Sequence, residues 1–165
     1  GLGCVLLPLF ILTYFGLDRY AYVRPAAVDA AIWFDSHTAP GSVLVGVTSN
    51  YPAQIGANYP VHEQVPCCYG ISLDENAFVD LASPDNTRVG GLVRSLQSFN
   101  VPAVYLEITP EEDAYAAILG EAPPGAVMRL GARLARSPAF RVVFDRDGVT
   151  LLRLRPSSGA SAIPQ

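Results

Sequence analysis

The side chains best suited to bind a small ligand lie together in one segment, residues 48–74. Its polar and aromatic members are Ser49, Asn50, Tyr51, Gln54, Asn58, Tyr59, His62 and Glu63. Aromatic rings stack on flat apolar faces, and amides, imidazoles and carboxylates hydrogen-bond to hydroxyl groups, so this set could bind a sugar. The alternative is a surface loop whose tyrosines cover the core, and loop composition by itself favours that interpretation. We take Asn50, Tyr51, Asn58, Tyr59 and His62 as candidate ligand contacts.

A sixth candidate, Glu107, stands near the end of an apolar run, residues 101–108. Ligands of open α/β sheets collect outside the carboxyl ends of the strands, where a glutamate could act as an acid or a base. The commoner fate of such a side chain is an ion pair with an arginine. The sequence leaves both roles open for Glu107.

The motifs of common catalytic centres are absent from the sequence. There is no GxSxG nucleophile elbow and no GxxxxGK[ST] phosphate loop. His37, His62 and Glu63 come from unrelated places and would supply at most three metal ligands. We therefore expect neither a metal nor a cofactor, and no residue is assigned a catalytic role.

Composition and charge exclude several classes of protein. The chain has 165 residues, of which 50% are hydrophobic and 16% charged, as in a folded domain. Its 11 arginines, absence of lysine and 15 acidic residues give a net charge of −4, which argues against a nucleic-acid-binding surface. Cys4, Cys67 and Cys68 match neither a disulfide framework nor a metal-ligand spacing. We interpret these cysteines as inert thiols.

Hydrophobic periodicity and turn residues predict the elements that position these side chains. Helices are expected over residues 25–37, 84–99, 109–120 and 125–136, and strands over residues 42–47, 101–108, 140–144 and 149–154. Residues 48–74 are expected to be irregular. This order predicts an α/β fold in which a layered mixed β-sheet carries flanking helices and a C-terminal hairpin.

Local signals support three of these elements. Val28, Ala31, Ile32 and Phe34 form an imperfect apolar stripe along residues 25–37. Thr109 is a helix cap, and the acidic residues 111–113 that follow suit the first turn of a helix. The dipeptide at residues 147–148, Asp-Gly, is typical of a tight hairpin turn.

Residues 1–17 contain no charge, and the composition changes abruptly at Asp18. Seventeen apolar residues are at the lower limit for crossing a bilayer. A signal peptide and a buried core helix are alternatives. We favour the last transmembrane helix of a longer protein, with Tyr14, Tyr20 and Tyr22 as interfacial anchors. Residues 18–155 then form an extracytoplasmic domain at the cell membrane, and residues 156–165 a disordered tail.

The helix, turn and strand after this leader resemble a known family. The stretch RPAAVDAAIWFDSHTAPGSVLVGV, residues 24–47, is similar to the junction after the last membrane helix of polytopic C-type (GT-C) glycosyltransferases, relatives of bacterial protein mannosyltransferases and aminoarabinose transferases. The matching residues are Ala30, Ala31, Trp33, Thr38, Pro40, Gly41, Ser42 and Val43. Residues 101–108 and the ending RSPAFRVVFDRDGVTLLRL, residues 136–154, also look similar to the C-terminal domains of these enzymes.

The resemblance implies a role without supplying a catalytic residue. Such enzymes transfer a sugar from a polyprenyl-phosphate donor at the outer membrane face, and their catalytic carboxylate lies in an early loop with no counterpart here. We therefore expect a non-catalytic extracytoplasmic domain of a membrane glycosyltransferase. Its expected partners are the bilayer, through residues 1–17, and a polyprenyl-phosphate sugar or a glycan acceptor. The alternative is a membrane-anchored binding or interaction module with no enzymatic role; a free hydrolase would need a nucleophile and a base that the sequence lacks.

Overall fold

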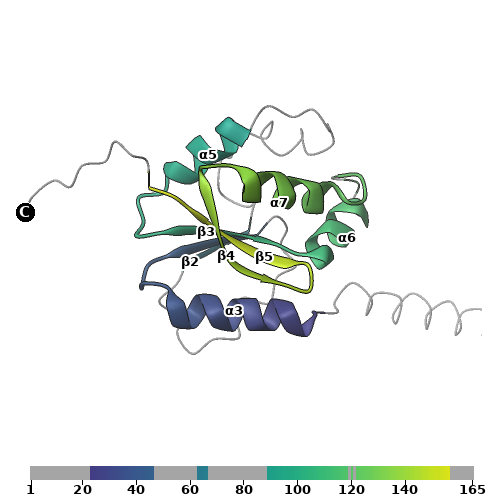
Figure 1. Ribbon diagram of the computed structural model, residues 1–165, viewed down its shortest axis with the longest axis horizontal. Coiled ribbons are helices and arrows are strands. Elements are labelled where there is room, and N and C mark those ends of the chain that lie inside the picture. Colours follow the sequence, from purple (N-terminus) through teal and green to yellow (C-terminus); the bar gives the residue numbers. More distant parts are fainter. Residues whose placement is uncertain (1–22, 47–62, 67–88, 119, 121, 157–165) are drawn as a thin grey trace, which may run out of the picture.

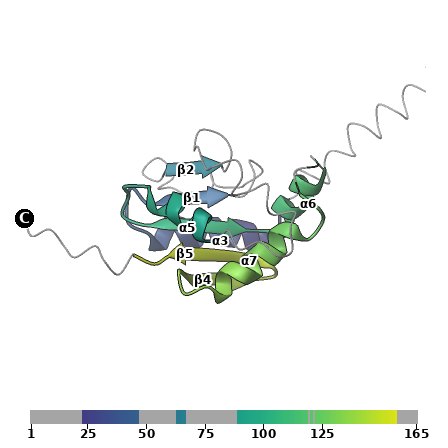
Figure 2. The same ribbon diagram turned by 90° about the horizontal axis from the view of Figure 1, so that it is seen from above.

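A sheet with helices on both faces forms the core of the fold, as shown in Figure 1. The structure is a computed structural model that describes residues 23–46, 63–66, 89–118, 120 and 122–156. Helix α3 (Pro25–His37) covers one face of the sheet, while α5 (Val89–Gln97) and α7 (Ala126–Arg136) cover the other. Helix α6 (Pro110–Ile118) lies at one end of the sheet, next to α7 (Figure 2). The predicted α/β layered architecture is confirmed for these residues.

The sheet has five strands in the order β2-β1-β3-β5-β4. The strands are β1 (Val43–Gly46), β2 (Glu63–Pro66), β3 (Val104–Ile108), β4 (Phe140–Arg146) and β5 (Val149–Leu154). Strands β2, β1 and β3 are parallel, whereas β3, β5 and β4 are antiparallel neighbours. The mixed sheet is thus confirmed. The carboxyl ends of β1, β2 and β3 lie at the same end of the sheet, which we call the carboxyl edge. It is distinct from the two lateral edges, which are formed by β2 and β4.

The C-terminal hairpin follows from its turn. Asp147 and Gly148 have φ values of 48° and 82°. Two consecutive positive φ angles define the turn type that fits the twist of an antiparallel pair, and Asp-Gly tolerates them best. Strands β4 and β5 are paired from Arg146–Val149 outward, with a bulge between Val142 and Phe144. The predicted hairpin is confirmed.

Two predicted boundaries were wrong. Residues 48–74, expected to be irregular, contain strand β2, which pairs in parallel with β1 at the edge of the sheet. An edge position tolerates Pro66, because the missing N–H does not interrupt a central ladder. Strand β3 begins at Val104 and not at residue 101, since Pro102 lacks the N–H that strand pairing would use.

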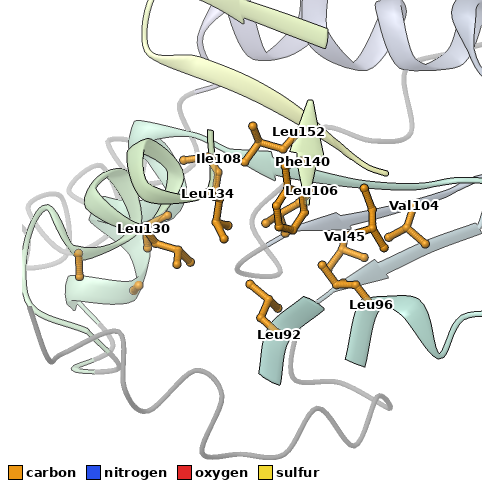
Figure 3. Close-up of a cluster of buried hydrophobic side chains, with 14 of the residues drawn as sticks. Val45, Leu92, Leu96, Val104, Leu106, Ile108, Leu130, Leu134, Phe140 and Leu152 are labelled. Carbon is orange, nitrogen blue, oxygen red and sulfur yellow. The ribbon is translucent and has the colours of Figure 1, made fainter. Parts of the chain in front are cut away.

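Two hydrophobic clusters lie on the two faces of the sheet. The larger one joins the sheet to α5 and α7, and Figure 3 shows Leu92 and Leu96 converging with Leu130 and Leu134 on the strands. The smaller one packs α3 against the other face through alanines and a phenylalanine: Ala26, Ala27, Ala30 and Phe34. Ile32, predicted to lie in the buried stripe of this helix, is 48% exposed. Small side chains let α3 pack closely, so its buried face is set by alanine spacing and not by its largest side chains.

The predicted membrane segment, residues 1–17, lies outside the described residues, as do residues 18–22 and 157–165. Among the helices that the structure does describe, none is long and apolar enough to cross a membrane.

Candidate functional site

Of the six candidate contact residues, the structure describes Glu107 alone. Asn50, Tyr51, Asn58, Tyr59 and His62 lie outside the described residues. Their segment leaves the sheet after Gly46, at the carboxyl edge, and rejoins it at Glu63, which pairs with Val43 at the opposite edge. The backbone of Glu63 is therefore about a strand length away from Glu107. Residues 47–62 therefore follow a strand end at the carboxyl edge, where Glu107 lies, and precede a strand start at the opposite end of the sheet.

Glu107 is fully buried at the carboxyl end of β3. All five residues of this strand are buried, and Glu107 itself has 0% exposure. Strand alternation places its side chain on the same face as Tyr105, the face that α3 covers. Within the part of the chain that the structure describes, neither carboxyl oxygen has a hydrogen-bond partner. Among the described residues no arginine pairs with Glu107, so neither of the two roles that the sequence left open is decided by an ion pair there.

The start of α6 brings two further carboxylates to Glu107. The backbone N–H of Glu112 donates a 3.0 Å hydrogen bond to Oγ1 of Thr109, which is the helix cap predicted from the sequence. This turn places Glu111 and Glu112 in the first turn of α6, only a few residues after Glu107. Glu112 is also fully buried. Three carboxyl groups thus share the carboxyl edge of the sheet.

This crowding favours the protonated form of Glu107. Burial raises the pKa of the Glu107 carboxyl well above its ordinary value, and the charges of Glu112 and Glu111 raise the pKa further. A low-polarity environment disfavours a carboxylate, and nearby carboxylates repel another negative charge. The protonated form that is favoured in this way has both a proton to donate and an oxygen to accept a hydrogen bond.

Arg24 brings the N-terminal end of α3 to the same edge. Its Nε lies 2.7 Å from Oε1 of Glu111, and the two side chains are 46% and 13% exposed. The Glu111 oxygens nevertheless have no aligned hydrogen-bond donor, so the contact is an ion pair without hydrogen-bond geometry. We call Glu107, Glu111, Glu112 and Arg24 the carboxyl-edge cluster. Sequence reasoning missed Arg24, because nothing local links it to Glu111.

The next acidic residue, Asp113, has a structural role. Its Oδ2 accepts a 2.7 Å hydrogen bond from the backbone N–H of Gly125, and its Oδ1 a 2.9 Å bond from that of Val127. These N–H groups belong to the start of α7, whose own N-cap, Gly125, supplies no side chain. Asp113 therefore caps α7 from the neighbouring helix and is not part of the cluster.

The cluster is suited to proton exchange and polar binding. Across the described residues, no three His, Cys, Asp or Glu side chains are placed to hold a metal ion. A protonated acid buried beside two carboxylates can donate a hydrogen bond to an anionic or hydroxylated group that an ionised carboxylate would repel. Because Glu107 has no exposed surface, such a group reaches it only when the covering side chains move.

Comparison with protein-family models, with curated proteins and with solved structures gave no match to this chain.

Proposed function

We propose that this chain is a non-catalytic, membrane-anchored extracytoplasmic domain of a polytopic C-type glycosyltransferase. It assists binding of a polyprenyl-phosphate sugar donor or a glycan acceptor at the carboxyl edge of its sheet. The observation that carries this proposal is Glu107, a fully buried carboxyl group that has no hydrogen-bond partner among the described residues. It lies at the carboxyl edge, where α/β sheets bind ligands. A buried polar group without a partner is costly, and such groups concentrate at functional sites.

The path of the chain supports a location close to the membrane. Residues 1–17 are the proposed membrane helix, and the described part of the domain begins at Val23. Arg24 is seven steps along the chain from Leu17, a stretch that spans at most about 25 Å at 3.3–3.6 Å per residue. Arg24 contacts Glu111 in the carboxyl-edge cluster. The cluster is thus within reach of a lipid headgroup from which a phosphate and its sugar project.

The chemistry of the cluster suits such a ligand. Arg24 is nearly half exposed and carries donors that match a phosphate. In the protonated form that its environment favours, Glu107 adds a hydrogen-bond donor without adding negative charge. Asn50 and Tyr51 follow Gly46 by four and five residues, so the chain keeps them within about 18 Å of the same edge. These two residues are the members of the sequence-based set best connected to the cluster.

The test uses the full 165-residue chain in lipid nanodiscs and a polyprenyl-phosphate sugar as ligand. We expect saturable binding that weakens in Tyr51→Ala and Arg24→Ala, with unchanged circular dichroism. The matched controls are Tyr115→Ala on α6 and Arg129→Ala on α7, which remove the same side-chain types elsewhere. Equal affinity in all four variants would refute the proposed site, and turnover of the donor by this chain alone would refute the non-catalytic role.

A further inference from the structure

Three arginines converge at the end of the sheet opposite α6. Arg141 is the second residue of β4, Arg153 is the last but one of β5, and Arg155 directly follows β5. All three are exposed. Within the described residues, none of them forms an ion pair with a carboxylate. This end of the domain therefore carries three positive charges that no described acidic side chain neutralises.

The register places two of these charges face to face. Arg141 and Arg153 are direct partners in the antiparallel pair of β4 and β5. Opposed like charges on neighbouring strands destabilise a sheet. An anion bound between Arg141 and Arg153 would explain this pairing most simply, because each guanidinium group would then be attracted to the anion.

Contacts with the protein hold two of the guanidinium groups in place. The guanidinium carbon of Arg153 lies 5.8 Å from the centre of the Tyr105 ring, within the range of a cation–π interaction. Nε of Arg155 donates a 3.2 Å hydrogen bond to the carbonyl oxygen of Phe140. Both contacts leave guanidinium N–H groups available to a ligand. They also restrict the side-chain rotamers, so that ligand binding costs less conformational entropy.

The arginines also surround a hollow of suitable size. Arg141, Arg153, Leu154, Arg155 and Pro156 line a cavity of about 450 Å³. Cavities that bind small molecules commonly have volumes of about 300–1,000 Å³. The described lining offers three cations and no carboxylate, so it favours a negatively charged ligand.

We infer that this cavity, the arginine pocket, binds the phosphate or diphosphate group of a ligand. A guanidinium fork matches the oxygens of a phosphate, and several forks around one pocket suit a tetrahedral, multiply charged group. A single carboxylate would leave most of the positive charge of the pocket without a partner. The pocket lies at the other end of the sheet from the carboxyl-edge cluster and does not depend on the function proposed for that cluster.

The test is isothermal titration of the full 165-residue chain with inorganic pyrophosphate at low salt. We expect binding that weakens as salt is added. The double variant Arg141→Gln and Arg153→Gln should lose about tenfold or more in affinity, as expected when charge-assisted hydrogen bonds are removed. The charge-matched control, Arg94→Gln with Arg136→Gln, changes two exposed arginines on α5 and α7 and should bind like the native chain.

A second arm separates a soluble phosphate from a lipid phosphate. The same three proteins are mixed with phosphatidylcholine vesicles, with and without phosphatidic acid. Pyrophosphate binding that is lost only in the pocket variant supports a soluble phosphate ligand. A dependence on phosphatidic acid that is lost only in the pocket variant supports a lipid phosphate. Binding in neither arm, or equal losses in both double variants, overturns the inference.

Discussion

Replacing Glu107 by Gln should change how the stability of the domain depends on pH. Glutamine has nearly the same shape as the protonated acid, so the packing at the carboxyl end of β3 is preserved. The native state raises the pKa of Glu107 through burial and through Glu112 and Glu111, whereas in the unfolded chain the pKa returns to its ordinary value. Between these two pKa values the native state holds one proton more than the unfolded state.

The sign and size of the effect follow from this one proton. Stability falls with rising pH wherever the native state binds more protons, by about 1.4 kcal/mol per pH unit for each proton. The contribution of Glu107 is complete below the unfolded pKa and is lost as the pH rises through the folded pKa. The stability of Glu107→Gln relative to the native chain should therefore increase with pH, by up to about 1.4 kcal/mol per unit in that range.

Urea unfolding followed by circular dichroism, at intervals between about pH 5 and pH 8, measures this slope. Asp147→Asn is the matched control, because it removes a carboxylate that is 74% exposed and asparagine tolerates the positive φ there. Its stability relative to the native chain should not vary with pH in this range. If the native chain and Glu107→Gln show parallel pH profiles, the raised pKa of Glu107 is refuted.

Three further predictions concern packing, capping and membrane attachment. Gly131→Ala should destabilise the domain by about 1–3 kcal/mol, because a Cβ there would lie 2.6 Å from Cγ2 of Ile108. Thermal unfolding measures this loss, and the control Ala132→Ser, on the exposed side of α7, should show no comparable loss. Asp113→Ala should cost about 1–2 kcal/mol by removing two hydrogen bonds to the start of α7, and a urea midpoint equal to that of the native chain would contradict this cap. Leu9→Arg should release the chain from liposomes in a flotation assay, because a charge in the centre of a membrane helix costs about 2.5–3.5 kcal/mol. Continued flotation of this variant would refute membrane insertion of residues 1–17.

The parts of the fold that the sequence predicted have local signals. Pro25 pre-sets the first turn of α3, Thr109 caps α6, and Asp147-Gly148 specifies the hairpin turn. Strand β2 has no such signal. Its four residues neither alternate nor form an apolar run, and its strand conformation depends on pairing with β1.

The candidate site was harder to predict, because its contacts are not local. Glu107 was identified from its position at a strand end, but its lack of a partner depends on packing. The ion pair between Arg24 and Glu111 joins the start of α3 to the start of α6. The arginine pocket depends on a bulge: regular pairing from the turn would place Arg141 opposite Leu154, and the register shift places it opposite Arg153. No sequence signal located that bulge.

The most direct test of the proposed function maps where a lipid-linked ligand binds. The full chain is reconstituted in nanodiscs with a photoreactive polyprenyl-phosphate sugar, and the cross-linked peptides are identified by mass spectrometry. We expect cross-links to Arg24, Glu111 and the chain just after Gly46, and we expect unlabelled donor to reduce them. Cross-links confined to the opposite end of the sheet, around Arg141 and Arg153, or none that unlabelled donor reduces, would contradict it.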